Sequence, residues 1–169
     1  MASQTVRLEA SRPQGVYLHS IAEVQGTVEP QTFMTLFNPV GSGRVLALST
    51  VALSYTNVNP ATEPAPMRGW RISATTGGTL IAAADMARFD NLQSNPVGQV
   101  RVSNPTPTLT QALFNSPAPI DNRSSAVHNV DIPAGAQFLI RPGEGLAIHK
   151  EAGIVSASWN VTMVWAEFI

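Results

Sequence analysis

The sequence of 169 residues contains no cysteine, a single lysine (Lys150) and few charged residues of any kind. Without cysteine, the chain can form neither disulfides nor thiolate metal sites. Asp, Glu, Lys and Arg make up 12% of the residues, about half of the ~25% that is typical of soluble domains. The net charge of −1 offers no basic surface, so we expect no nucleic-acid partner.

Long apolar runs are also missing. No run approaches the length of about 20 residues that a membrane span needs, and the first fifteen residues lack the apolar core of a signal peptide. We therefore expect no membrane partner, and a chain that folds in the compartment where it is made.

The low charge has two interpretations. Charged residues are depleted in the cores of protein interfaces, so a folded chain with few charges favours a protein that buries much of its surface against neighbours. The alternative is a monomer whose surface is covered by Ser, Thr, Asn and Gln.

The last segment gives the clearest structural signal. From Val155 to Trp165, apolar residues alternate with Ser, Asn and Thr, and both Trp159 and Trp165 fall on the apolar side. A period of two predicts a strand with one buried face. Such a strand is not stable alone in water, so a second sheet must cover it.

Further strands are predicted between glycine- and proline-rich turns such as Pro142–Gly145. They lie within residues 1–30 and at Thr32–Phe37, Arg44–Tyr55, Arg68–Ala74, Gly98–Val102, Val127–Ile132, Gln137–Arg141 and Leu146–His149. The segment Thr79–Arg88 is ambiguous, because its alanines favour a helix while its first residues would suit a hairpin with the strand at Arg68. Ser103–Asn122 holds four prolines and is predicted as a long loop, either a functional excursion or a contact arm.

The pattern predicts an all-β fold, an antiparallel, jelly-roll-like β-sandwich. Residues 1–30 are expected to form an N-terminal arm and edge strands, with the arm at Met1 to Gly15 ordered only by contact. Residues 31–169 are expected to form a single sandwich domain.

The residues that carry chemistry do not form a motif. His19, His128 and His149 share no short pattern. His149 and Glu151 could point the same way, but a metal site needs a third ligand, and the H-x-H pair of cupins is missing. Nothing local pairs the aspartates, which include Asp85, Asp90, Asp121 and Asp131, and no G-x-S-x-G turn is present. We predict no catalytic, cofactor-binding or metal-binding residues, and no enzyme; the rival is a cupin-like site at His149.

Tryptophans on a β-sandwich can also form a platform for sugars. Trp159 and Trp165 are expected in the core instead, because they lie on the apolar face of the last strand. The sequence does not decide whether Trp70 lies in the core or belongs to such a platform.

Three segments carry a resemblance to a known family. The runs LFNPVGSGRVLAL from Leu36, GGTLIAAADMARFDN from Gly77 and IRPGEGLAI from Ile140, in this order and followed by a long final strand, resemble tailed-bacteriophage virion proteins of the capsid decoration (cement) type. The resemblance covers Phe33 to Phe168 and is weakest from Ser103 to Val127. It implies a jelly-roll-like sandwich, symmetric oligomers that are often trimers, attachment to the outside of a capsid, and no catalytic residues.

From these observations we expect a virion structural protein made in the host cytoplasm. It would form a homotrimer and bind the major capsid protein at the capsid surface, through the N-terminal arm and the Ser103–Asn122 loop. The alternative is a carbohydrate-binding or host-adsorption module of a head fibre or tail.

Overall fold

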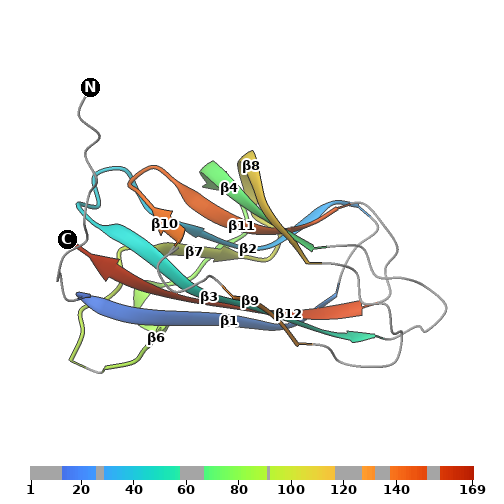
Figure 1. Ribbon diagram of the computed structural model, residues 1–169, viewed down its shortest axis with the longest axis horizontal. Coiled ribbons are helices and arrows are strands. Elements are labelled where there is room, and N and C mark those ends of the chain that lie inside the picture. Colours follow the sequence, from blue (N-terminus) through green and yellow to red (C-terminus); the bar gives the residue numbers. More distant parts are fainter. Residues whose placement is uncertain are drawn as a thin grey trace.

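The computed structural model describes residues 13–25, 29–57, 67–90, 92–116, 127–131, 138–151 and 157–169. Over these ranges nearly every element is a strand, and the strands form two antiparallel sheets that lie face to face (Figure 1). The predicted all-β sandwich is therefore confirmed. Among the described residues, the one helical segment is a single 3₁₀ turn, η1 (Ala83–Asp85).

Sheet A has the strand order β10-β3-β12-β1-β6, and β9 also pairs with β3. Its strands are β1 (Gly15–Gln25), β3 (Val45–Asn57), β6 (Ala87–Arg88), β9 (Val127–Asp131), β10 (Phe138–Ile140) and β12 (Ala157–Phe168). The final strand β12 lies between β1 and β3 and pairs with each over most of its length. The C-terminal segment is thus the centre of this sheet.

Sheet B has the strand order β5-β7-β2-β11-β4-β8. Its strands are β2 (Gln31–Phe37), β4 (Met67–Thr76), β5 (Thr79–Leu80), β7 (Gln99–Val102), β8 (Thr106–Ser116) and β11 (Gly145–Lys150). Here β11 is the central strand, and it pairs with β2 on one side and with β4 on the other.

The strand order identifies the sandwich as a jelly roll. In sheet A the order is β1-β12-β3 followed by β9 and β10, which pair with successive parts of the same edge of β3. In sheet B the matching order is β2-β11-β4-β8. The chain passes back and forth between two four-stranded layers in the pattern of two Greek keys, which is the jelly-roll connectivity.

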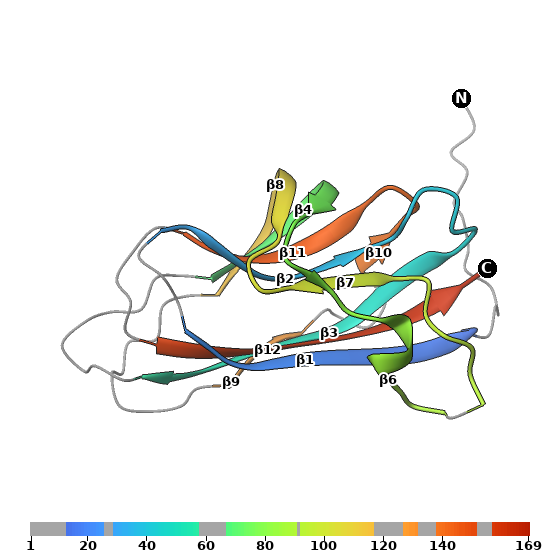
Figure 2. The same cartoon turned by 180° about the vertical axis from the view of Figure 1, so that it is seen from behind.

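An insertion between β4 and β8 adds β5, η1, β6 and β7. It begins in sheet B, crosses to pair with β1 in sheet A and returns to pair with β2 in sheet B (Figure 2). Both predictions for Thr79–Arg88 are wrong: the alanines form one 3₁₀ turn rather than a helix, and β5 pairs with β7 rather than with β4. The insertion instead extends both sheets on the side where β1 and β2 lie.

The predicted loop Ser103–Asn122 is also wrong for most of its length. Residues Thr106–Ser116 form β8, an edge strand that pairs with β4 through several β-bulges. Edge strands tolerate proline because one side of their backbone needs no ladder partner. Residues 117–122 lie outside the described part of the chain.

Within residues 1–30, the described part of the chain has one strand, β1, which pairs with β12 over most of its length and with β6 only at Tyr17 and Leu18. A β-bulge interrupts the pairing of β1 with β12 between Ile21 and Val24. Of the expected arm, residues 1–12 lie outside the described part of the chain.

The core lies between the two sheets, and β12 supplies its largest side chains. Trp159, Val161, Met163 and Trp165 are at most 2% exposed, as their alternation predicted. The tilted ring of Tyr17 lies 5.9 Å from that of Trp165, and Phe33 meets Trp159 edge-on. The strand predicted at Thr32–Phe37 is confirmed as part of β2, and it is buried over nearly its whole length.

Candidate functional site

The two histidines whose side chains the structure describes lie in different sheets, His19 on β1 and His149 on β11. Burial lowers the pKa of both imidazoles. For His149, the charge of Glu151 opposes this effect and the charge of Lys150 adds to it, and both effects are smaller than that of burial. The side chain of His128, on β9, is not among those described.

His149 and Glu151 are the two residues that the sequence analysis considered as part of a metal site. The carboxylate of Glu151 pairs with Arg68 at 3.3 Å. Within the described ranges, no three His, Asp or Glu side chains gather where they could hold a metal ion. The Pro142–Gly145 segment forms a turn as expected: Gly143 has a φ of 85° and the N–H of Glu144 donates to the carbonyl of Arg141 at 2.9 Å.

The aspartates of the sequence analysis are not shown as a pair. Asp85 and Asp90 are both exposed, and Asp90 accepts the N–H of Leu92 at 2.9 Å, which is a local turn bond. Asp121 lies outside the described residues, and the side chain of Asp131 is not described.

Two of the three tryptophans are not available to a ligand, since Trp159 and Trp165 belong to the core. Trp70, on β4, is half-buried, and its indole N–H has no hydrogen-bond partner among the described residues.

The outer face of sheet A is the largest feature that the sequence analysis did not locate. We call it the neutral face. Its described side chains are Leu18 and Ser20 of β1, Thr50, Ala52 and Ser54 of β3, and Asn160, Thr162 and Val164 of β12. These alternate with core residues such as Val161 and Met163, so they point away from the core. None of them carries a charge.

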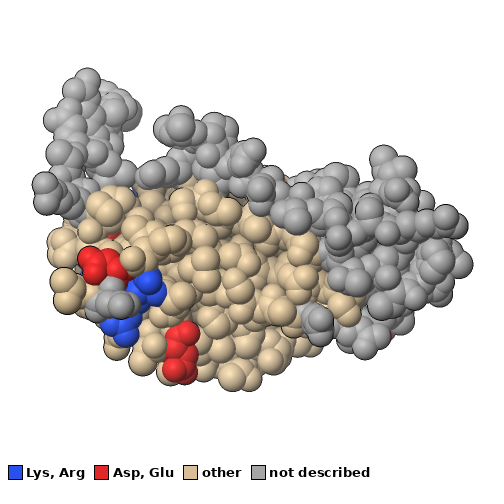
Figure 3. All heavy atoms as spheres, turned by 90° about the horizontal axis from the view of Figure 1, so that it is seen from below, with Lys and Arg blue, Asp and Glu red and all other residues tan. Residues whose placement is uncertain are grey.

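Two pairs of polar side chains on the neutral face bond to each other. The hydroxyls of Ser20 and Thr162 lie 2.7 Å apart, and the amide nitrogen of Asn160 donates to the hydroxyl of Ser54 at 3.1 Å. Side chains that are already paired along the sheet lose little when water leaves them. Figure 3 views the molecule from the side of sheet A, where the visible charged side chains gather at one end and the rest of the described surface is uncharged.

That end of the sandwich, where β12 finishes, also exposes apolar side chains. We call it the loop end. Val40 is 83% exposed, Leu92 94%, Ile169 79% and Phe89 66%. They belong to the β2–β3 loop, the β6–β7 loop and the C-terminus. Two contacts bring these segments together: the N–H of Phe89 donates to the carbonyl of Val16, and Arg44 pairs with Glu167.

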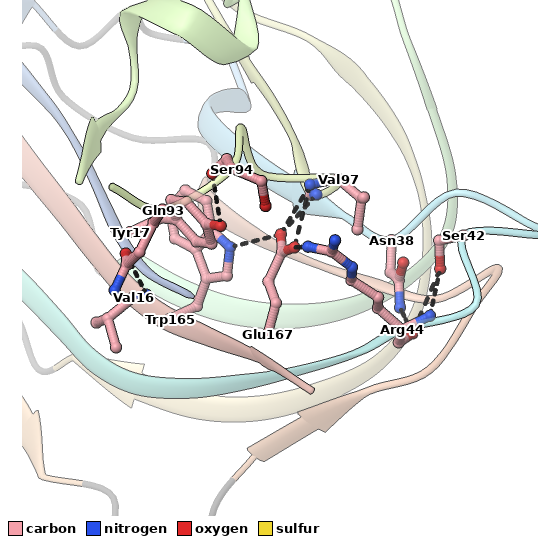
Figure 4. A network of polar contacts seen from close by, with 11 residues as sticks. Val16, Tyr17, Asn38, Ser42, Arg44, Gln93, Ser94, Val97, Trp165 and Glu167 are labelled. Carbon is pink, nitrogen blue, oxygen red and sulfur yellow. Dashed lines mark hydrogen bonds and ion pairs between the residues drawn. The ribbon is translucent and has the colours of Figure 1, made fainter. Parts of the chain in front are cut away.

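A buried carboxylate holds the loop end together (Figure 4). Glu167 is fully buried and accepts the N–H of Gly98 at 2.9 Å, the N–H of Val97 at 3.0 Å and the indole N–H of Trp165 at 3.4 Å. Its second oxygen pairs with the guanidinium of Arg44 at 2.8 Å. These contacts tie the β2–β3 loop and the insertion to the last strand, so the site is structural.

The insertion is also fastened to β1. The hydroxyl of Tyr17 donates to the carbonyl of Ser94 at 2.9 Å, and the N–H of Val16 donates to the side-chain oxygen of Gln93 at 3.1 Å (Figure 4). Phe89 and Leu92 are therefore presented on an anchored loop.

A pocket of about 290 Å³ lies on sheet B, where the chain leaves β7 for β8. Its polar groups belong to Thr32, Asn104, Thr106 and His149, and its apolar walls are formed by Pro30, Pro105, Pro107 and Leu109. The Nδ1 atom of His149 lies 3.0 Å from the hydroxyl of Thr32, and Asn104 accepts the N–H of Thr32 at 3.1 Å. Of these residues, sequence analysis singled out His149 alone.

The chain matches no family model, and a search of the curated proteins finds no match. Among the described residues, none of the helical structure has the length and apolar character needed to cross a membrane.

Proposed function

We propose that this protein is a capsid decoration (cement) protein of a tailed bacteriophage. It assembles as a homotrimer and binds the outer surface of the major capsid shell, which it stabilises. The jelly roll alone does not decide this, since one fold serves many functions. The proposal rests on the surface.

The observation that carries the proposal is the neutral face. Interface cores are depleted of charged residues, because an unpaired charge is costly to bury. Ser20, Ala52 and Thr162 lie side by side across three strands of this face without a charge among them. A surface of this kind suits contact with another protein, and the 12% charged content of the whole chain agrees with that use.

The loop end offers a second contact. Leu92 and Phe89 are large apolar side chains on an anchored loop, and such exposed apolar groups serve as interface anchors. Two contact surfaces per copy suit a cement protein, which joins sister copies and the shell. Many weak contacts of this kind add up through avidity.

A charge placed on the neutral face tests the proposal. Ser20 and Ser73 are both exposed strand serines, Ser20 on β1 in the neutral face and Ser73 on β4 in the other sheet. Ser20→Asp should lower the oligomer mass in light scattering and reduce binding to capsids, while Ser73→Asp should change neither. Equal assembly of both variants would count against the neutral face as an interface.

The number of copies of this protein in purified phage particles, and their position, test the proposed role as a capsid decoration protein. Mass spectrometry of purified particles of the encoding phage should find many copies on the head. A few copies at a vertex or on the tail would instead favour a fibre or host-adsorption module. Trp159 and Trp165 are buried in the core, so neither of them can form an aromatic platform for sugars.

A further inference from the structure

The pocket beside His149 is built by a crossing of the chain over sheet B. β7 and β8 are separated in the sheet order by β2, β11 and β4, but only residues 103–105 join them. This short crossing is possible because the paired ends of β4 and β8 fold back over the outer face of the sheet, where the hydroxyl of Thr75 lies 3.2 Å from that of Thr35. The crossing lies near the start of β2, and Asn104 takes the place of a further strand partner by accepting the N–H of Thr32.

The crossing contains backbone strain. Ser103 and Asn104 have φ angles of 60° and 59°, in the left-handed region that residues other than glycine seldom adopt. Two such residues in succession are held in place by their surroundings, and strain of this kind gathers at binding sites. The hydrogen bond from the Thr32 N–H, 3.1 Å long, holds the Asn104 carboxamide at the pocket wall.

The lining of the pocket is uncharged. Three prolines give it apolar walls, and its polar groups are the Asn104 amide, the Thr32 and Thr106 hydroxyls and the His149 imidazole. Burial lowers the pKa of His149, so this ring is neutral near pH 7. A pocket without charge favours a neutral ligand, and a few polar groups among apolar walls are the usual composition of a small-molecule site.

The polar atoms of the pocket that have no partner among the described residues would suit the hydroxyl groups of a ligand. Nδ1 of His149 is engaged by Thr32, which leaves Nε2 without a hydrogen-bond partner in the described structure. Nε2 donates in one tautomer and accepts in the other, and a hydroxyl group can meet either. The Asn104 nitrogen is a further donor with no partner among the described residues.

We propose that this pocket binds one neutral sugar ring, with the hydroxyls of the ring on Asn104 and His149 and its C–H face on the prolines. The volume of about 290 Å³ is at the lower end of ligand pockets, which suits a single ring rather than a chain. The binding site is separate from the neutral face, so it does not depend on the proposed function.

NMR titration of the full chain with D-glucose, D-galactose, D-mannose and N-acetyl-D-glucosamine tests the inference. At least one sugar should give saturable shifts that centre on Thr32, Asn104 and His149, with millimolar affinity. Asn104→Gly keeps the left-handed backbone available while it removes the amide. It should weaken binding by about fivefold, the usual effect of one lost hydrogen bond.

Two further variants keep the test decisive. His149→Phe should abolish the sugar shifts in a protein whose remaining spectrum is native, and Ser73→Ala, outside the pocket, should bind as the wild type does. No saturable shifts with any of the four sugars would overturn the proposal. So would shifts that survive His149→Phe, or a pocket that takes sulfate in place of sugars.

Discussion

Exchange of one oxygen of the buried Glu167 carboxylate for an amide nitrogen should destabilise the protein strongly. Both oxygens are acceptors: one takes the N–H groups of Val97 and Gly98, and the other takes the guanidinium of Arg44. In Glu167→Gln, the new NH₂ group faces a donor whichever way the amide turns. The variant loses a buried ion pair and gains a donor–donor contact.

The magnitude follows from burial. The Glu167 side chain is 0% exposed and that of Arg44 is 19% exposed. Removal of one partner of a buried pair costs about 3–5 kcal/mol, and the partial exposure of Arg44 reduces this to about 3 kcal/mol. In a chain of this length about 1 kcal/mol shifts Tm by about 2–4 °C, so we expect a fall of roughly 10 °C.

The same exchange at Glu144 is the matched control. Glu144 pairs with Arg71 at 2.7 Å, but their side chains are 32% and 27% exposed, and an exposed pair contributes at most about 1 kcal/mol. Thermal and urea unfolding, followed by tryptophan fluorescence, compare the two variants with the wild type. If Glu167→Gln lost no more stability than Glu144→Gln, the reasoning about the buried carboxylate would be refuted.

Two further predictions concern stability. Because burial lowers the pKa of His19 and His149 in the folded state, the unfolded chain binds more protons below about pH 6.5, and stability should fall as the pH drops from about 7.5 to about 5.5. His149→Gln should flatten this dependence in urea unfolding, and a wild-type midpoint that is constant over the range would contradict the prediction. A Cβ atom at Gly145 would lie 2.6 Å from the carbonyl oxygen of Leu36 and 2.9 Å from Ile72, so Gly145→Ala should cost about 1–3 kcal/mol; an unchanged unfolding midpoint would show that β2 can shift to admit it.

The strands that were predicted correctly share a strong local signal. The alternation in β12 placed Trp159, Val161, Met163 and Trp165 in the core, where they lie. The same alternation places Glu167 on the inner face as well, but a charged residue is not expected at a core position, so its burial was not predicted. Its partners come from loops far away in the sequence, and only the tertiary structure shows why a carboxylate is stable there.

The two incorrect segments failed for related reasons. The prolines of 103–122 indicated a loop, although the threonines at 106, 108 and 110 favour a strand, and an edge position makes the prolines compatible with one. The alanines of 79–88 favour a helix, but the insertion forms short pairings with β1 and β7. Sequence patterns describe local conformational preference. Which sheet edges are available for pairing depends on the rest of the fold.

The consecutive apolar residues Phe33 and Met34 illustrate a subtler limit. Both belong to the core. In a regular strand, neighbouring side chains point to opposite faces, so both cannot face the core. The register between β2 and β11 shifts beside Ile148, so that Met34 pairs with Ile148, Thr32 pairs with His149 and Phe33 is the extra residue of a β-bulge. The bulge also directs Thr32 and His149 toward the pocket. The apolar residues of this strand indicate its burial, but nothing in the sequence indicates the bulge beside the pocket.

The two outer faces of the sandwich are used differently. In sheet B, Thr35 and Ala147 alternate with core residues and point outward, yet both are 0% exposed. The hydroxyls of Thr35 and Thr75 lie 3.2 Å apart, so the chain itself covers part of this face. In sheet A, the outward residues Ala52, Thr162 and Val164 keep part of their surface open. If the proposed partner binds the neutral face, the lack of charge among the described side chains of that face means that shape and apolar contact, rather than ion pairs, would select it.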